Sequence, residues 1–267
     1  MAIVIKTPAE IEAMAASGRV LARCHRLLLN KARPGVTTKE LDEAAEKFIR
    51  SQGGVPSFKG YHGFPGSICV SPNSMVVHGI PGDYALQRGD VLCVDIGVTL
   101  DGWVSDAAVT LPIGQITPIA RNLLDTTRAS LFEGVEQARP GNRLGDVSHA
   151  IQARVEADGF SIIRSLVGHG VGRDMHEDPQ IPNFGRPGTG PELEEGMVLA
   201  IEPMVNAGGH EVRMGTDGWA VYSEDGSLAS HFEHTVAVTA DGPRILTPWH
   251  EEEGFAAPVA SRAAAQA

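Results

Sequence analysis

A weak internal repeat constrains the fold more than any other feature of this 267-residue sequence. Residues 89–95 read GDVLCVD and residues 196–202 read GMVLAIE, which share the pattern Gly-x-Val-Leu-x-[Val/Ile]-[Asp/Glu]. A second carboxylate follows each copy between similar flanks, in DAAV at 106–109 and in EHTV at 233–236. A unit of strand, acid, connection, acid and strand therefore occurs twice, and it predicts a chain built from two related halves.

The first copy reads as a β-hairpin whose tip is Asp101-Gly102, a favoured two-residue turn. Counting back from this tip, Asp106 lies opposite Gly97, which shares a face with Asp95 because side chains alternate along a strand. The two aspartates are then diagonal neighbours, about 7–8 Å apart along the backbone, and the glycine leaves the space between them open. The opposite face carries apolar side chains that suit a core, namely Leu92, Val94 and Ile96.

Two ionised carboxylates this close on a partly buried face repel each other and lose hydration, which costs roughly several kcal/mol per ion. One acid could keep its proton, a basic side chain could pair with each, or a multivalent cation could bind both. Residues 91–120 contain no Lys or Arg. If the repeat brings the second pair of acids, Glu202 and Glu233, to the first, four carboxylates match the charge of two divalent cations. The alternative, four exposed and unrelated acids, leaves the duplication unexplained.

Histidines are the other candidate ligands. His169 lies in SLVGHGVG at 165–172, among three glycines that would let a loop approach a ligand closely, and we predict that it binds one metal ion. His78 and His176 are candidate hydrogen-bond donors or acids beside the metals, although the setting of each taken alone favours a structural role. The settings of three further histidines suggest no function: His25, His149 and His250.

Helix start signals recur along the chain. Capping boxes occur at 7–10 and 37–40, and Thr117-Pro118 starts a third helix. Four helices are expected near 8–30, 38–53, 118–140 and 142–157. Strand-like runs occur at 67–70, 91–96, 103–111, 198–201, 219–222 and 232–239. The alternation predicts one α+β layered domain over residues 1–250, followed by a disordered tail at 251–267.

Composition narrows the classes of function. The net charge is −11, with ten Lys and Arg against six Asp and Glu in residues 1–60, so the remainder is strongly acidic and a poor nucleic-acid binder. No apolar run approaches the ~20 residues of a membrane span, and the N-terminus lacks a signal-peptide pattern. Three well-separated cysteines argue against a disulfide framework and predict a reducing, cytoplasmic location.

The assembled motifs resemble the methionine aminopeptidases. Five residues match the metal ligands of that family in type and chain order: Asp95, Asp106, His169, Glu202 and Glu233. The resemblance extends from Thr7 to about Pro248. The short connection between Glu202 and Glu233 leaves no room for the helical insertion of the type II enzymes. The chain therefore resembles the type I, bacterial-like short form without an N-terminal extension.

The resemblance implies the pita-bread fold, in which two pseudo-twofold α+β halves surround a dinuclear metal site. It also implies removal of the initiator methionine from nascent proteins when the next residue is small. Asp106 and Glu233 would bridge two divalent ions, which could be Co, Mn, Fe or Zn. Asp95 would hold one ion, and His169 with Glu202 would hold the other.

The resemblance further implies roles around the substrate. Glu202 would move a proton from the attacking water to the leaving amine. His78 would contact the scissile amide nitrogen, and His176 would polarise the carbonyl. Further residues match or replace residues of the methionine pocket: Tyr61, Cys69 and Trp219 match it, whereas Phe58, Phe64 and Met175 stand where Cys, Tyr and Phe are common. The replacements stay bulky and apolar, and thioether–aromatic contacts suit a methionine substrate.

Other functions remain open at this point. An Xaa-Pro aminopeptidase or prolidase shares the fold and the ligand set, and a non-catalytic member would use the same fold as a binding module. We expect a monomer that acts on the N-terminal Met of nascent peptides and binds neither DNA nor membranes. The basic N-terminal segment, with Arg19, Arg23 and Arg26, suggests a contact with ribosomal RNA, although a solvated helix face explains it as well.

Overall fold

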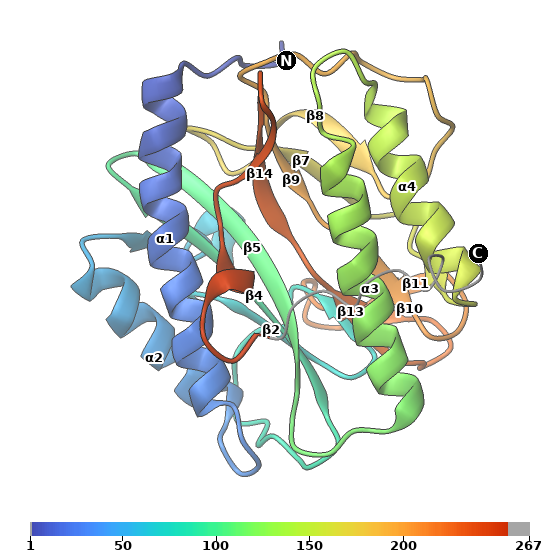
Figure 1. The fold of residues 1–267 in the computed structure, drawn as a ribbon. Coiled ribbons are helices and arrows are strands. Elements are labelled where there is room, and N and C mark those ends of the chain that lie inside the picture. The colour runs from blue at the N-terminus through green and yellow to red at the C-terminus, as the bar shows by residue number, and fades with distance from the viewer. Residues whose placement is uncertain (1, 256–267) are drawn as a thin grey trace.

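The structure is a computed structural model that describes residues 2–255. Four long helices cover one face of the strands, with α1 and α3 on either side of a central strand (Figure 1). Their bounds are α1, Pro8–Lys31; α2, Thr38–Ser51; α3, Pro118–Glu136; and α4, Leu144–Ala157. Short 3₁₀ turns occur at η1, Tyr61–Gly63, and η2, Trp249–Glu251.

The strands form four sheets. The first comprises β1 (Val55–Pro56), β4 (Val91–Leu100) and β2 (Cys69–Pro72) in that order, with β5 (Trp103–Pro112) on β4. The largest follows the order β15 (Gly242–Ile245), β14 (His234–Thr239), β9 (Val198–Ile201), β7 (Val167–Gly170) and β8 (Glu177–Pro182). Two small sheets follow the orders β13 (Ala229–His231), β10 (Met204–Asn206), β6 (Ser161–Ile162), and β11 (Val212–Met214), β12 (Val221–Ser223), β3 (Met75–Val77).

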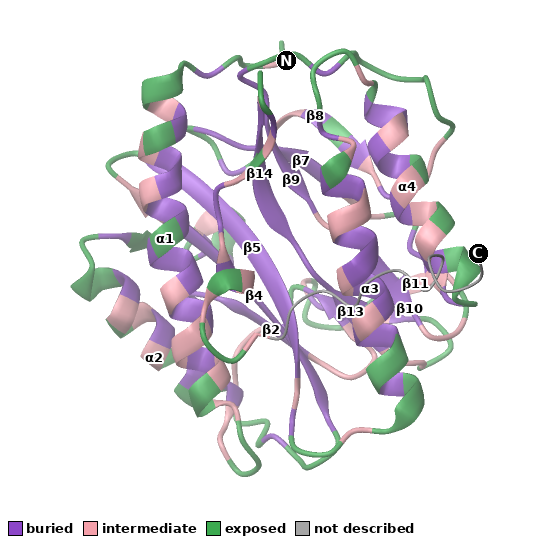
Figure 2. Ribbon diagram, in the orientation of Figure 1, coloured by how far each residue is buried: buried purple, intermediate pink, exposed green. Residues whose placement is uncertain are grey.

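The helices form where the start signals predict them. Thr7 and Thr37 each accept a hydrogen bond from the backbone N–H three residues on, and the glutamate at that position accepts one from the backbone N–H of the cap residue. The inward faces of the helices and nearly all of the long strands are buried (Figure 2). α1 also docks through a polar contact, because Ser17 Oγ donates to the Val98 carbonyl of β4 at 2.8 Å.

The predicted hairpin register is confirmed. In the β4–β5 pair Leu100 lies opposite Trp103, and Gly97 lies opposite Asp106. The turn residues Asp101 and Gly102 have positive φ values of 51° and 75°, as this tight turn requires. The run expected at 198–201 is β9 without displacement, whereas the run expected at 91–96 continues four residues further, to Leu100 of β4. The remaining strand expectations are displaced by one or two residues at their ends, and the strand expected at 219–222 begins only at Val221.

The two halves join along β5 and the segment that runs from β13 into β14. The Glu233 N–H donates to the Ala108 carbonyl at 2.9 Å. On one side of this bond, Thr235 Oγ1 donates to the Asp106 carbonyl and accepts from the Asp106 N–H. On the other side, Thr110 Oγ1 makes the same pair of bonds to His231. Two threonine side chains therefore stand in for backbone pairing across the seam and fix the halves in register.

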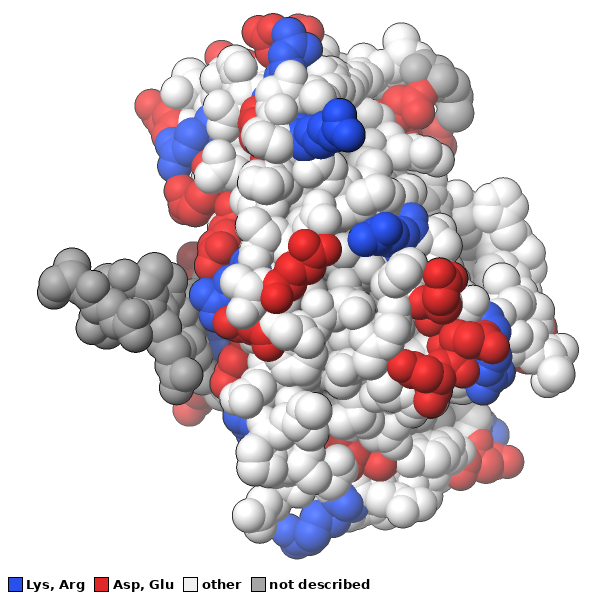
Figure 3. Space-filling model, turned by 90° about the vertical axis from the view of Figure 1, so that its right-hand side faces the viewer, with Lys and Arg blue, Asp and Glu red and all other residues white. Residues whose placement is uncertain are grey.

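Charge on the surface follows the acidic composition. On the face shown in Figure 3, carboxylates gather in groups while Lys and Arg stand mostly singly among them. This face offers no continuous basic track for a nucleic acid. Within residues 2–255, no helix combines the length and the apolar character that crossing a membrane requires.

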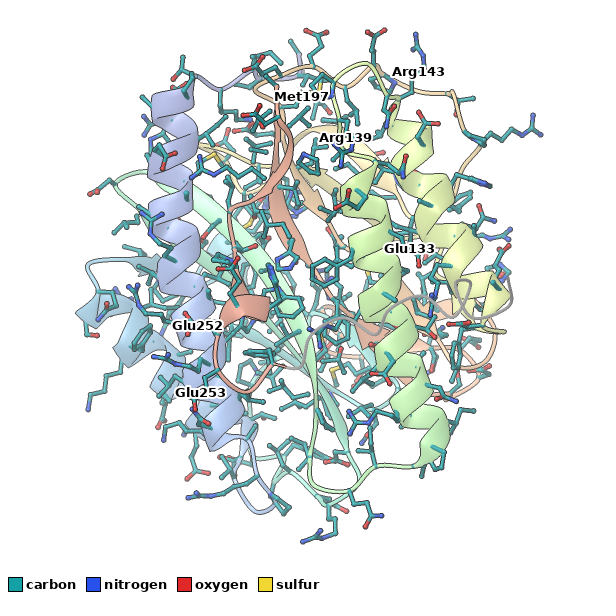
Figure 4. The ribbon with its side chains drawn as sticks, viewed as in Figure 1. Glu133, Arg139, Arg143, Met197, Glu252 and Glu253 are labelled. Carbon is teal, nitrogen blue, oxygen red and sulfur yellow. The ribbon has the colours of Figure 1, made fainter. Side chains whose placement is uncertain are left out.

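The predicted C-terminal tail begins too early. Trp249 is completely buried, and its Nε1 donates to the Glu233 carbonyl at 2.9 Å. Beyond it, Glu252, labelled in Figure 4, pairs with Arg26 of α1 at 2.9 Å. Phe255 packs its ring 5.5 Å from that of Trp249. Residues 251–255 therefore belong to the domain, and residues 256–267 of the predicted tail lie outside the described residues.

Candidate active site

A cavity of about 300 Å³ opens between the two halves of the molecule. Its walls carry acids, histidines and apolar side chains from both halves. The lining residues are Phe58, Tyr61, His62, Phe64, Cys69, Val77, His78, Asp95, Asp106, Leu166, Val167, His169, His176, Glu202, Met204, Trp219, His231 and Glu233. All of the predicted site residues except Met175 line this one cavity.

The four predicted acids meet here because the two strand pairs present them from opposite sides. Asp95 lies on β4 and Asp106 on β5, while Glu202 directly follows β9 and Glu233 directly precedes β14. The second copy is not an exact replica of the first. Its pairing continues from Ile201 opposite His234, so its two acids lie opposite each other rather than on a diagonal. Relative to the first copy, the pairing of the two acids is shifted by two residues. A shift of two keeps a side chain on the same face of a strand, so both acids still face the cavity.

His169 lies on β7 and not in the loop that its glycines suggest. A Cβ at Gly168 would strike the Ala200 carbonyl oxygen, and one at Gly170 would strike the Asp178 carbonyl oxygen. The glycines therefore let β7 pack tightly between its neighbouring strands. His169 Nδ1 lies 2.9 Å from the Gly170 carbonyl, which can only accept, so Nδ1 carries the proton. Nε2 then presents its lone pair to the cavity, as a metal ligand must.

Burial dominates the electrostatics of this site. Loss of hydration raises the pKa of Asp106 to about 7. Burial, reinforced by the charge of Asp106, raises the pKa values of Asp95, Glu202 and Glu233 well above the usual range. Burial also lowers the pKa of His169 to about 4, so its ring is neutral. Without a cation these buried acids hold their protons to higher pH than free carboxyl groups do, and a bound cation would favour their ionised forms.

The donor set fits a divalent metal. Ligand atoms of Asp106, His169 and Glu233 all lie within 4.8 Å of one another. His169 Nε2 lies 3.7 Å from Glu202 Oε1, which brings the fourth acid to the same point. One oxygen each of Asp95, Asp106 and Glu233 is buried without a hydrogen-bond partner. Such orphaned carboxylate oxygens are the atoms that a bound cation would satisfy.

His78 and His176 flank the acids, and both are open to the cavity. His176 Nδ1 lies 2.8 Å from the Tyr61 hydroxyl, and its ring centroid lies 4.3 Å from that of His169. His78 has a left-handed backbone with φ of 60°, which is uncommon for a residue with a side chain. Burial lowers the pKa values of both histidines, so each is neutral at pH 7.

The apolar wall contains most of the predicted methionine pocket. Phe64 meets Trp219 edge to face at 5.1 Å between ring centroids, and Cys69 lies beside them. Met175 does not line the cavity, so its predicted contact with substrate is not supported by its position. It packs behind the wall instead, where a Cβ on Gly97 would lie 2.7 Å from Met175 Cε and 2.8 Å from Phe58 Cε1. Met175 therefore supports the pocket wall from behind, in one apolar cluster with Phe58.

Sequence reasoning missed two histidines of the lining, His62 and His231, and four apolar residues: Val77, Leu166, Val167 and Met204. A signal for His231 exists, because it precedes Glu233 by two residues and alternation places both on one face. The others come from segments whose contribution depends on how the halves are placed, so their sequences carry no comparable signal.

The model of metallopeptidase family M24 matches residues 12–240 of the chain. This chain belongs to metallopeptidase family M24. Its resemblance to the methionine aminopeptidases is also confirmed. Methionine aminopeptidase 1 of Bacillus subtilis is 53% identical over 245 residues, covering 92% of this chain and 99% of the relative. The crystal structure of methionine aminopeptidase from Thermotoga maritima superposes with a TM-score of 0.91 at 45% identity, over 92% of this chain and 99% of that one.

Prolidases are more distant members of the same architecture. The prolidase from Pyrococcus furiosus has a TM-score of 0.73 at 22% identity, and the match covers 91% of this chain but only 65% of that one. At this identity the likeness concerns the fold alone. It confirms the pita-bread architecture that the repeat and the resemblance predict. Membership of M24, together with the buried acid cluster, makes this chain a hydrolase that depends on divalent metal.

Proposed function

We propose that this chain removes the N-terminal methionine from newly made proteins. The observation that carries this conclusion is identity of about half of all residues to methionine aminopeptidases over nearly their whole length. The cavity agrees with it, since carboxylates and histidines lie at one end and aromatic and aliphatic side chains at the other. A residue with a free amine and an apolar side chain suits this division. The Xaa-Pro alternative and the non-catalytic alternative are not favoured.

Two divalent ions would be held by the four acids and His169. The predicted ligands would be Asp95, Asp106, Glu202 and Glu233 through carboxylate oxygens and His169 through Nε2. When bound, the ions would supply a nucleophilic water near neutral pH and a Lewis acid for the carbonyl. The mixed oxygen and nitrogen donor set suits Co, Mn, Fe or Zn.

The side chains of the chain itself divide the remaining work. Glu202 would accept the proton of the attacking water and return it to the leaving amine, because it lies at the cavity and its pKa is raised by burial. His176, held at Nδ1 by the Tyr61 hydroxyl, presents Nε2 to the carbonyl oxygen of the substrate. His78 would contact the scissile amide nitrogen. Excluding water from the methionine side chain falls to Phe58, Phe64 and Trp219.

The purified, metal-loaded chain is expected to hydrolyse Met-Ala-Ser and to leave Ala-Pro-Ala intact. The kcat/KM for Met-X-Ser peptides should fall as residue X becomes larger. The methionine side chain fills the pocket, so a large side chain at X would clash with the cavity walls. Release of the first amino acid across a Met-X-Ser series, measured by chromatography, checks this. Cleavage of Ala-Pro-Ala at a comparable kcat/KM would contradict the assignment, and absence of any cleavage by a fully metallated protein would favour a binding module.

The finer context of the reaction is also a proposal. We propose that the chain acts as a monomer, because it supplies all five predicted metal ligands and an apolar wall to one cavity, so the site is complete without a second copy. The substrates are chains at the ribosome, and the three cysteines are free, which supports a cytoplasmic location. The structure leaves fewer candidate residues for a ribosome contact through the basic N-terminal segment. Arg26 pairs with Glu252 and Arg23 donates to Gln52, so Arg19 is the exposed arginine of the three.

Reversal of charge at Arg19 tests that contact. Arg19→Glu is expected to reduce co-sedimentation with ribosomes, because a phosphate-rich surface loses one cationic partner and meets an anion instead. Turnover of free Met-Ala-Ser should stay at the parent value, since Arg19 lies outside the cavity. Co-sedimentation equal to that of the parent at low salt would end the ribosome proposal.

A further inference from the structure

His231 is a buried cavity histidine that lies at the end of β13. Its backbone is fixed on both sides, because Thr110 Oγ1 donates to its carbonyl at 2.8 Å and accepts from its N–H at 3.0 Å. The strand pairing of β13 with β10 adds a third restraint. A histidine whose backbone is held this firmly can direct one ring nitrogen to a defined place. That nitrogen is Nε2, which is buried without a hydrogen-bond partner beside the predicted metal ligands Glu202 and Glu233.

The hydrogen bond at the other ring nitrogen, Nδ1, determines whether Nε2 carries the proton of the neutral ring. His231 Nδ1 lies 3.7 Å from the thiol sulfur of Cys93, which is itself buried on β4. A thiol shut away from water keeps its proton and acts as a weak donor. When Cys93 donates to Nδ1, the proton of the neutral ring must lie on Nε2. His231 then has the opposite tautomer from His169, whose Nδ1 donates to a carbonyl.

The two histidines lie on either side of one carboxylate. His169 Nε2 is 3.7 Å from Glu202 Oε1, whereas His231 Nε2 is 3.5 Å from Glu202 Oε2 and 4.0 Å from Glu233 Oε2. The lone pair of His169 Nε2 therefore faces Oε1 of Glu202, while the N–H of His231 Nε2 faces Oε2. The 3.5 Å contact between His231 Nε2 and Glu202 Oε2 is at the outer limit of a hydrogen bond, and such contacts shorten when an active site is fully assembled.

We propose that His231 is a positioning residue whose Nε2–H donates to the Glu202 carboxylate, with Cys93 fixing the tautomer. This inference rests on the proposed roles of Glu202 as metal ligand and proton carrier. The bond holds Oε2 and so turns Oε1 toward the metal site, where His169 Nε2 lies. It also satisfies a buried donor that would otherwise cost stability. His231 is not itself a metal ligand in this arrangement.

Ring ¹⁵N–¹H correlation spectra of the zinc-loaded protein test the proposal directly. The His231 resonance, assigned by its loss in His231→Gln, is expected to show a protonated Nε2 and a bare Nδ1. The His169 resonance is expected to show the reverse, with Nε2 bound to zinc. A zinc-bound Nε2 or a protonated Nδ1 on His231 would overturn the proposal. This readout does not depend on which peptides the protein cleaves, so it separates failure of the proposal from failure of the proposed function.

Matched variants add a functional measurement. His231→Leu is expected to lower zinc affinity, measured by chelator competition, by about 10- to 100-fold, and to lower kcat with little change in KM. His231→Gln should stay within about threefold of the parent, because an amide nitrogen supplies the donor again. His25→Gln, at a buried histidine outside the cavity, controls for loss of a core ring. Equal losses in the Gln and Leu variants at 231 would refute the hydrogen-bond role.

Discussion

Replacing Asp95 with asparagine is expected to remove bound divalent metal and to reduce hydrolysis of methionyl peptides by more than about 100-fold. Even residues that only contact a metal ligand are worth about 10- to 100-fold, and Asp95 belongs to the donor set itself. Asp95 Oδ1 is buried without a hydrogen-bond partner, so a bound cation would satisfy it. The neutral amide of asparagine supplies neither the negative charge nor the second oxygen. Metal content by mass spectrometry and turnover of Met-Ala-Ser, measured on the same sample, check the prediction.

The thermal stability of the metal-free protein provides the control. Asp95→Asn is expected to lower activity but not to lower this stability. Burial raises the pKa values of the four acids, with that of Asp106 at about 7. The unfolded chain releases these protons near pH 4 and the folded chain holds them longer, so the free energy of unfolding falls as pH rises between these values. Removing one of these acids makes the fall in the free energy of unfolding smaller. Metal-free Asp95→Asn should therefore melt no lower than the metal-free parent at pH 8.

Wild-type metal content with full turnover in Asp95→Asn would contradict the ligand assignment. A melting temperature well below that of the metal-free parent would instead indicate that Asp95 contributes to the fold. The two measurements keep these explanations apart. Adding metal should reverse the pH trend of the parent, because the cation binds the ionised acids and stabilises the folded state at high pH.

Trp249→Ala is expected to destabilise the protein by about 3–5 kcal/mol, the range typical of deleting a buried aromatic side chain. Trp249 is completely buried and stacks on His234 with 4.5 Å between ring centroids. Its Nε1 also donates to the Glu233 carbonyl, directly behind a predicted bridging ligand. Urea unfolding of the metal-free protein measures the loss. Metal affinity is expected to fall as well, because Glu233 loses a backbone restraint.

The same substitution at the cavity tryptophan is a matched comparison. Trp219 is only half-buried, so Trp219→Ala should leave the urea midpoint close to that of the parent while raising KM for methionyl peptides. If both alanine variants lost stability equally, burial would not be the cause of the effect at Trp249. If Trp249→Ala unfolded at the parent midpoint, the C-terminal segment around Trp249 would not be part of the folded domain.

Local rules determined much of this molecule. Two capping boxes placed α1 and α2, and the Asp101-Gly102 turn fixed the register that brings Asp106 opposite Gly97. These features depend on neighbours a few residues away, so a sequence states them directly. The same holds for the acid pairs, whose spacing within a duplicated pattern predicted their convergence. All four acids line one cavity for that reason.

Errors occurred where a residue depends on distant backbone. The glycines around His169 suggested a loop, but they exist because β7 packs against the carbonyls of Ala200 and Asp178. Met175 lies next to His176 in the chain, yet the turn of the backbone sends it behind the pocket wall. The expected start of the tail at 251 failed because Glu252 and Phe255 find partners in α1 and at Trp249.

The sequence by itself determined which acids and which histidine could bind metal, since charge, spacing and strand alternation are local. Only the tertiary structure decided how the halves meet, through threonines 110 and 235 and the bond from Glu233 to Ala108. It also placed His231 Nε2 3.5 Å from Glu202 Oε2 and His231 Nδ1 3.7 Å from the sulfur of Cys93. The physical reason is that hydrogen bonds across the seam join residues more than 100 positions apart. No local pattern encodes such a pairing, which exists only once both halves have folded.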